Sequence, residues 1–89
     1  MKFKDSKHIH LIGIGGINVS AIAKLLKAFD TQVSGSDVAT SDITRELEKE
    51  GIKISIGQKA ENITDDISLV IFSDAIPEDN VERQTAAQK

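Results

Sequence analysis

The sequence predicts an α/β domain in which a parallel sheet of four to five strands has helices on both faces. Two observations support this class. Short apolar runs alternate with amphipathic segments of helical length along the chain, an alternation that is typical of parallel βαβ units. The first apolar run is followed by a turn with three glycines in four positions, residues 13–16, where a strand would have to pass into a helix.

The first two elements are a strand over residues 8–14 and a helix over residues 17–29. The segment HIHLIGI is apolar and rich in β-branched residues, which is typical of a buried strand. In the following segment the apolar residues recur at helical spacing and form two neighbouring rows, which we expect to face the core. The rows are Ile17, Ala21 and Leu25, and Ile22, Leu26 and Phe29.

A second strand, a second helix and a third strand follow. Residues 31–37 read as a short strand that ends in small polar residues. Ser41 is a suitable N-cap for a helix that continues to Glu50, and Gly51 stands where such a helix would stop. Residues 53–57 give the third strand.

The last strand and a helical tail complete the pattern. Residues 68–76 form the most hydrophobic run of the chain, and we expect a fully buried fourth strand there. Pro77 precedes a polar tail that is expected to be helical, with residues 78–80 as its cap. The whole order is Rossmann-like, and its crossovers should be right-handed. Because the tail is not followed by a concluding element, we expect the chain to be a piece of a longer protein.

Composition limits the classes of function that the chain can have. Its hydrophobic fraction of 39% and charged fraction of 28% fit one small globular domain over residues 1–89. A net charge of −3 without basic runs argues against nucleic-acid and membrane-surface partners. Cysteine is absent, which excludes disulfides and thiolate metal sites and is compatible with a reducing cytoplasm. No secretory signal or membrane-spanning run is evident.

The glycine turn is the main candidate for a binding site. Gly13 and Gly15 fit the first two glycines of the G-x-G-x-x-G pattern, which allow a tight turn and close approach of a phosphate. The free amides of the following helix favour an anion, with about 1.5–3 kcal/mol for each bond to a charged oxygen. Asn18 stands at the third glycine position, where it could donate to a ligand or push the helix away. Alternatively, the turn serves packing alone.

Asp37 ends the second predicted strand, 24 positions after Gly13. An acidic residue near this place takes the ribose hydroxyls in dinucleotide-binding domains. Ser36 and Asp37 are also good turn residues, so that Asp37 could instead cap the following turn. The sequence leaves both roles open.

Three blocks, HLIGIGGINVSAIAKLL, VSGSD and SDAIPEDN, occur in this order and together resemble the amino-terminal domain of the Mur ligases. The resemblance covers residues 7–83 and is strongest to those members that join L-alanine to UDP-N-acetylmuramate. His10 matches a histidine of the family pattern, and we expect it to be a strand residue without a catalytic role. Four positions depart from the pattern: Asn18 replaces a glycine, Val19 a methionine, Asp74 a serine and Gln58 a histidine.

The resemblance implies a cytoplasmic, three-domain, ATP-dependent ligase of peptidoglycan precursor synthesis. Its first domain, residues 1–89 here, would bind the UDP-sugar, while ATP, Mg²⁺ and L-alanine would bind to the other domains. The substrate's carboxylate would be activated as an acyl phosphate. This part of the ligase would contain no catalytic residue and no metal site, and it lacks a Gly-Lys-Thr phosphate loop. The resemblance assigns the UDP-sugar site to Gly13, Gly15, Gly16, Asn18, Ser20, Ser36, Asp37 and Ser73.

Three alternatives remain open at this level. A recycling ligase of the same family attaches a ready-made tripeptide to the same nucleotide sugar, but the GIGG and AIPEDN segments favour the alanine-adding enzyme. An NAD(P)-binding domain of a dehydrogenase or channel regulator would share the glycine turn and Asp37, although SDAIPEDN is not expected in it. A Rossmann-like interaction domain would have the turn without a ligand.

Overall fold

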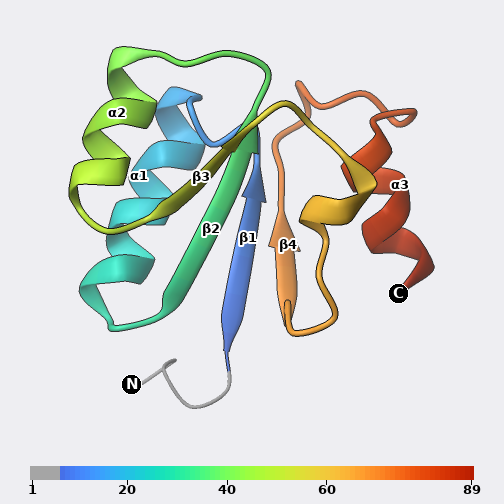
Figure 1. The fold of residues 1–89 in the computed structure, drawn as a ribbon, viewed down its shortest axis with the longest axis horizontal. Coiled ribbons are helices and arrows are strands. Elements are labelled where there is room, and N and C mark those ends of the chain that lie inside the picture. Colours follow the sequence, from blue (N-terminus) through green and yellow to red (C-terminus); the bar gives the residue numbers. More distant parts are fainter. Residues whose placement is uncertain (1–6) are drawn as a thin grey trace.

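The computed structural model describes residues 7–89 and shows one parallel sheet with the strand order β3-β2-β1-β4 (Figure 1). The first six residues of the expected domain lie outside the described part. The strands are β1 (His8–Ile12), β2 (Gln32–Asp37), β3 (Lys53–Ile56) and β4 (Leu69–Ile71). The helices are α1 (Ile17–Ala28), α2 (Asp42–Lys49), the 3₁₀ turn η1 (Ala60–Asn62) and α3 (Val81–Gln88).

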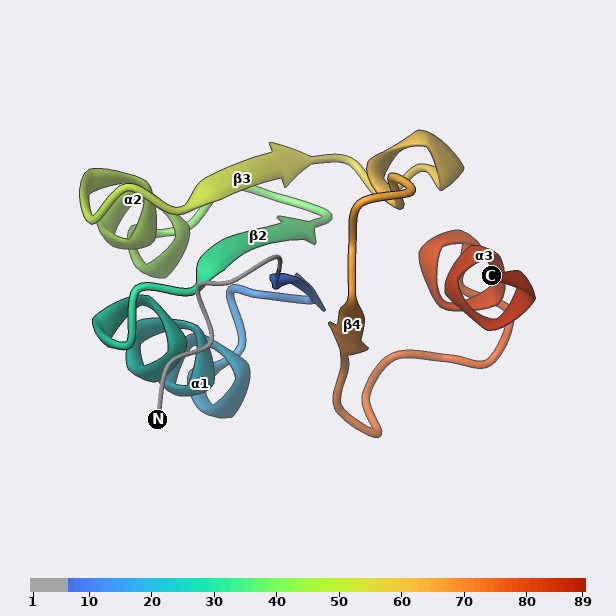
Figure 2. The same ribbon diagram turned by 90° about the horizontal axis from the view of Figure 1, so that it is seen from below.

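Helices cover both faces of the sheet, which confirms the predicted α/β class. Figure 2 shows α1 and α2 on one face and η1 and α3 on the other. All strand pairs are parallel, so the carboxyl ends of the strands and the loops that follow them gather at one edge of the sheet. In such sheets ligands bind at this edge.

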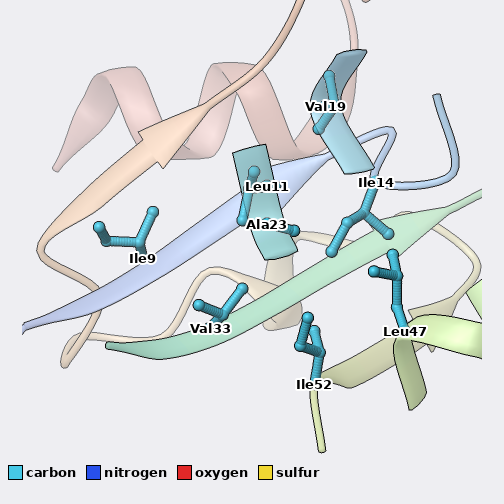
Figure 3. Close-up of a cluster of buried hydrophobic side chains, with 8 residues drawn as sticks. All are labelled: Ile9, Leu11, Ile14, Val19, Ala23, Val33, Leu47 and Ile52. Carbon is cyan, nitrogen blue, oxygen red and sulfur yellow. The ribbon is translucent and has the colours of Figure 1, made fainter. Parts of the chain in front are cut away.

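The apolar core lies between the sheet and the layer of α1 and α2 (Figure 3). Strands alternate their side chains between two faces, and Ile9, Leu11 and Val33 point to this layer. Burial of a large aliphatic side chain stabilises the fold by about 1.5–3 kcal/mol. The buried cluster comprises Ile9, Leu11, Ile14, Val19, Ala23, Val33, Leu47 and Ile52.

The predicted core face of α1 is mostly wrong. Ile17 and Leu25 are 80% and 59% exposed, whereas Val19, Ser20 and Ala23 are buried. The helix packs against β2 with the face that carries Val19, Ser20 and Ala23. Because small side chains face the sheet, the larger ones of Ile17 and Leu25 lie on the outside, whereas Leu26 of the second predicted row packs against the core.

The predicted fourth strand is also wrong in length and burial. β4 has three residues instead of the nine expected over 68–76, and Leu69 is 52% exposed. It pairs with β1 alone and forms an edge of the sheet, and an apolar run does not tell an edge strand from a central one. β1 likewise ends at Ile12, two residues before the predicted end, although Ile14 remains buried.

The predicted ends of α2 are confirmed to within one residue, and the predicted cap of α3 is confirmed. Ser41 caps α2 by accepting a hydrogen bond from the Thr44 amide, and the Thr44 hydroxyl accepts one from the Ser41 amide. Gly51 follows this helix with φ +93°, a conformation that favours glycine. Asn80 caps α3. Within residues 7–89, the helices are all too short or too polar to cross a bilayer.

Candidate functional site

The glycine turn after β1 is fixed to the end of β2. The amides of Gly13 and Ile14 both donate to the Ser36 carbonyl, at 2.9 and 3.0 Å, and the Gly16 amide donates to the Gly13 carbonyl at 3.0 Å. Gly13 has φ +74°, and a Cβ on it would lie 2.9 Å from Ile76 Cδ1. The turn is therefore tight and is packed against the loop that follows β4.

The start of α1 is open to a ligand. Gly16 is its N-cap and has no side chain to bond the first amides, and within residues 7–89 nothing accepts from the amides of residues 17–19. By contrast, side chains cap both α2 and α3. Unbonded amides and the positive end of the helix dipole make this end suitable for an anion.

Asn18 and Ser20 lie differently in this first turn of the helix. Asn18 is exposed, and its side-chain amide is therefore accessible beside the free backbone amides. Ser20 is 7% exposed, and its hydroxyl donates to the Ile17 carbonyl at 2.9 Å. Asn18 therefore does not push the helix away from the strand, and the Ser20 hydroxyl hydrogen is already engaged.

Asp37 lies directly beside the glycine turn. Its Oδ2 accepts from the Gly15 amide at 2.8 Å, and its Oδ1 accepts from the Val38 amide at 2.8 Å. A Cβ on Gly15 would lie 2.8 Å from Asp37 Oδ2 and 3.2 Å from Thr44 Cγ2. Gly15 thus allows the carboxylate of Asp37 to approach, and its amide is bonded to that carboxylate.

Ser36 and Ser73 have different surroundings. Ser36 is fully buried under the turn, and its hydroxyl donates to Glu82 Oε1 at 2.6 Å. Ser73 is exposed in the loop after β4, where its Oγ accepts from the Ala75 amide. The same loop holds Ile76 against Gly13. The structure thus brings Ser73's loop and Asp37 to the glycine turn, while the Ser36 hydroxyl points to the opposite layer.

Two of the positions that depart from the family pattern also lie in these loops. Asp74 is exposed next to Ser73. Gln58 follows β3, and its side-chain oxygen accepts from Asn80 Nδ2, which joins it to the cap of α3.

Glu82 is a functional candidate that the sequence analysis missed. Its carboxylate is fully buried and lies within 3.0 Å of donor atoms from four residues: His10, Ser36, Asn62 and the backbone of Lys59. Burial raises the pKa of the Glu82 carboxyl, but the hydrogen bonds from these donors outweigh burial and hold its pKa below the usual value. The one local signal was a glutamate two places after the cap Asn80, and it does not reveal burial.

Two paths of hydrogen bonds connect Glu82 to the glycine turn. In the first path, the Ser36 hydroxyl donates to Glu82, and the Ser36 carbonyl accepts from the amides of the glycine turn. In the second path, Asn62 Nδ2 contacts both Glu82 Oε2 and the Gly57 carbonyl, and the Gly57 amide donates to the Asp37 carbonyl at 2.8 Å. Helix α3 therefore helps to fix the end of β2 and Asp37.

Two hollows are present on the described surface. The larger, of about 660 Å³, runs between β4 and α3 and contains no residue of the glycine turn. A smaller one, of about 280 Å³, lies between α1 and α2 and includes Ile17 and Ser20 at the start of α1. We place the candidate site at the turn because free donors are found there. In residues 7–89, no three His, Asp or Glu side chains gather in a way that could hold a metal ion.

A family model and individual relatives both match this chain to the Mur ligases. The family described as "Mur ligase family, catalytic domain" matches residues 8–89. A UDP-N-acetylmuramate–L-alanine ligase of Lachnoclostridium phytofermentans is 55% identical over 87 residues, which are 98% of this chain and 18% of that protein. A protein of the same name from Campylobacter jejuni is 50% identical over 82 residues, 92% of this chain and 19% of its own length. The chain thus spans about a fifth of these relatives.

Solved structures show the same fold. The UDP-N-acetylmuramate–alanine ligase of Thermotoga maritima matches with a TM-score of 0.86 and 37% identity, over 91% of this chain and 19% of that chain. A murein peptide ligase of Psychrobacter arcticus matches with a TM-score of 0.82 and 26% identity, over 92% of this chain and 18% of that one.

Proposed function

The chain belongs to the Mur ligase family, and on that premise we propose that it is the amino-terminal, UDP-sugar-binding domain of a UDP-N-acetylmuramate–L-alanine ligase. The observation that carries the proposal is the open start of α1 beside the glycine turn. This end offers unbonded amides to a ligand with paired negative charges, and a nucleotide diphosphate is such a ligand.

The diphosphate would be held by the backbone amides of residues 17–19, with the side chain of Asn18 as a further donor. Each bond from an amide to a charged oxygen contributes about 1.5–3 kcal/mol, whereas the helix dipole adds about 0.3–1 kcal/mol at an exposed end. Gly13, Gly15 and Gly16 would act by shaping the turn, because their amides are bonded to Ser36, Asp37 and Gly13.

The uridine would lie toward Asp37 and Ser73. Each carboxylate oxygen of Asp37 already accepts one amide, but it has a second lone pair with which it can accept from a ribose hydroxyl. Ser73 is exposed on the neighbouring loop and could contact the same ligand. The buried Ser36 would support the site through its carbonyl and its bond to Glu82.

The chemical step would take place in the rest of the parent ligase. ATP and Mg²⁺ would bind there, the carboxylate of the sugar would be activated as an acyl phosphate, and the amine of L-alanine would attack it. No residue of this chain takes a catalytic role in this proposal. The parent enzyme would act in the cytoplasm, in peptidoglycan precursor synthesis, where it would use UDP-N-acetylmuramate.

A recycling ligase that attaches a tripeptide to the same sugar nucleotide is the second candidate. The match to a murein peptide ligase supports it, while the higher identity to alanine ligases favours the first. Both candidates need the same nucleotide site. Ligase assays of the full parent protein with L-alanine and with the tripeptide would separate them.

NMR titration of the ¹⁵N-labelled chain tests the nucleotide site. UDP should shift the amide signals of residues 13–20 and of Asp37 with millimolar affinity, about −4 kcal/mol. Uridine, which lacks the phosphates, should leave the signals of residues 17–19 almost unchanged. The proposal fails if NADH shifts these signals at lower concentration than UDP, or if UDP shifts signals elsewhere only.

A further inference from the structure

A continuous line of polar side chains crosses the face of the sheet that η1 and α3 cover. The line runs from Asp66 to His8, Ser34, His10 and Glu82, and its four contacts measure 2.9, 2.7, 2.8 and 2.9 Å in this order. The three middle side chains and Glu82 are buried, whereas the Asp66 side chain is 62% exposed. These contacts join β1 to β2, to α3 and to the loop before β4.

Each of these four contacts needs one hydrogen. An ionised carboxylate supplies none, the serine hydroxyl supplies one, and a neutral imidazole supplies one. Ser34 and two neutral histidines therefore supply three hydrogens for four contacts. The line is one hydrogen short unless a carboxyl or an imidazole takes up a further proton.

Both carboxyl groups favour their ionised forms. Donors around Glu82 hold its pKa below the usual value despite burial. At the other end, hydrogen bonds from Thr64 and His8 lower the pKa of Asp66. The additional hydrogen therefore belongs to the histidines.

We propose that His8, Ser34 and His10 together bind one extra proton, which completes the line between the two carboxylates. The proton resides mainly on His10, because a buried carboxylate such as Glu82 needs a neighbouring positive charge more than the solvated Asp66 does. His10 then donates to Glu82 and to Ser34, Ser34 donates to His8, and His8 donates to Asp66.

The charged groups among the described neighbours of the two histidines are Asp66 and Glu82. Asp66 comes from the loop before β4, Glu82 from α3, and β2 presents the neutral Ser34 and Ser36 on this face. Val70, the partner of His10 in β4, is apolar. Among these described neighbours, the two carboxylates alone carry charge, and both favour the protonated pair.

Loss of the proton at higher pH would open one contact at the exposed end. The neutral line keeps its bonds if His10 donates to Glu82, Ser34 donates to His10, and His8 donates to Ser34. His8 Nδ1 then presents a lone pair to Asp66, and water can bond that carboxylate instead. The histidine pair thus ties the loop around Asp66 to the sheet only while the proton is bound.

Amide variants at the two ends make opposite predictions for the histidine tautomers. In Asp66→Asn the new amide donates to His8 Nδ1, so two neutral histidines, each protonated at Nε2, complete the line. In Glu82→Gln the new amide donates to His10 Nε2, so two neutral histidines, each protonated at Nδ1, complete it. Either variant removes the need for the extra proton.

Ring ¹⁵N NMR of the histidines in the 89-residue chain tests this directly, in the wild type and in both variants across a pH series. The wild type should show a doubly protonated His10 at neutral pH, whereas the two variants should show neutral rings in the opposite tautomers. Glu46→Gln is the matched control, because Glu46 is exposed and pairs with Lys24. The histidine signals of this variant should change with pH as those of the wild type do.

Two results would overturn the proposal. One is a folded wild type at neutral pH in which both histidines are neutral. The other is a titration of Asp66→Asn that equals that of the wild type, and this variant loses no buried group. No nucleotide enters this experiment, so its outcome is independent of the proposed function.

Discussion

Replacement of Glu82 by alanine should remove a large part of the stability of the domain. The change deletes the shared acceptor of four donors, which come from β1, β2, η1 and the segment before η1. It leaves the His10 ring and the Ser36 hydroxyl in a buried place without their partner. An unsatisfied buried donor costs about 1–3 kcal/mol.

The size of the effect follows from this environment. With the proton on His10 that is proposed above, Glu82→Ala removes one partner from a buried ionic pair, and such a removal costs about 3–5 kcal/mol. At about 0.05–0.15 kcal/mol per residue, a chain of 89 residues has roughly 4–13 kcal/mol in total. For a domain of this size, 1 kcal/mol corresponds to about 4–8 °C in the melting temperature. Glu82→Ala should therefore lower Tm by roughly 12–40 °C.

Urea unfolding followed by circular dichroism measures the change, with Glu78→Ala as the control. Glu78 is exposed in the loop before α3, and its replacement should alter stability by less than about 0.5 kcal/mol. Equal midpoints for the two variants would refute the role assigned to the Glu82 carboxylate.

Three further predictions concern the same region. Gly15→Ala should weaken UDP binding measured by NMR titration, because its Cβ would lie 2.8 Å from Asp37 Oδ2 and displace that carboxylate; unchanged binding would show that the position of Asp37 does not matter. Asp74→Ser should tighten UDP binding severalfold, because it removes a negative charge near the diphosphate. The same titration at low and high salt measures this change, and equal UDP affinities of variant and wild type would show that the Asp74 side chain points away. The lowered pKa of Glu82 stabilises the fold above the usual carboxyl range, and this contribution should disappear as pH falls through the folded-state value; urea midpoints of the wild type and Glu82→Gln should therefore converge in acid.

The sequence was sufficient where local chemistry decides the structure. The cap of α2 depends on Ser41 and Thr44, three positions apart, and the stop of the helix depends on Gly51. The order of strands and helices likewise followed from the alternation of apolar and amphipathic segments. The glycine turn was located from its spacing alone, and the structure places Asp37 beside it.

The sequence was insufficient to predict features that depend on contacts between distant segments. Ile17 and Leu25 repeat with helical spacing, yet α1 packs against β2 with Ala23 turned inward in their place. β4 is exposed because no strand lies on its outer side. The bond between Ser36 and Glu82 joins residues 46 positions apart, and no local pattern indicates that a polar tail buries a carboxylate.

A crystal structure of the chain with UDP would test the central claim most directly. We predict diphosphate oxygens within hydrogen-bond distance of the amides of residues 17–19, with the ribose toward Asp37. A fully occupied UDP bound away from the start of α1, or a glycine turn that stays without ligand at saturating UDP, would contradict it.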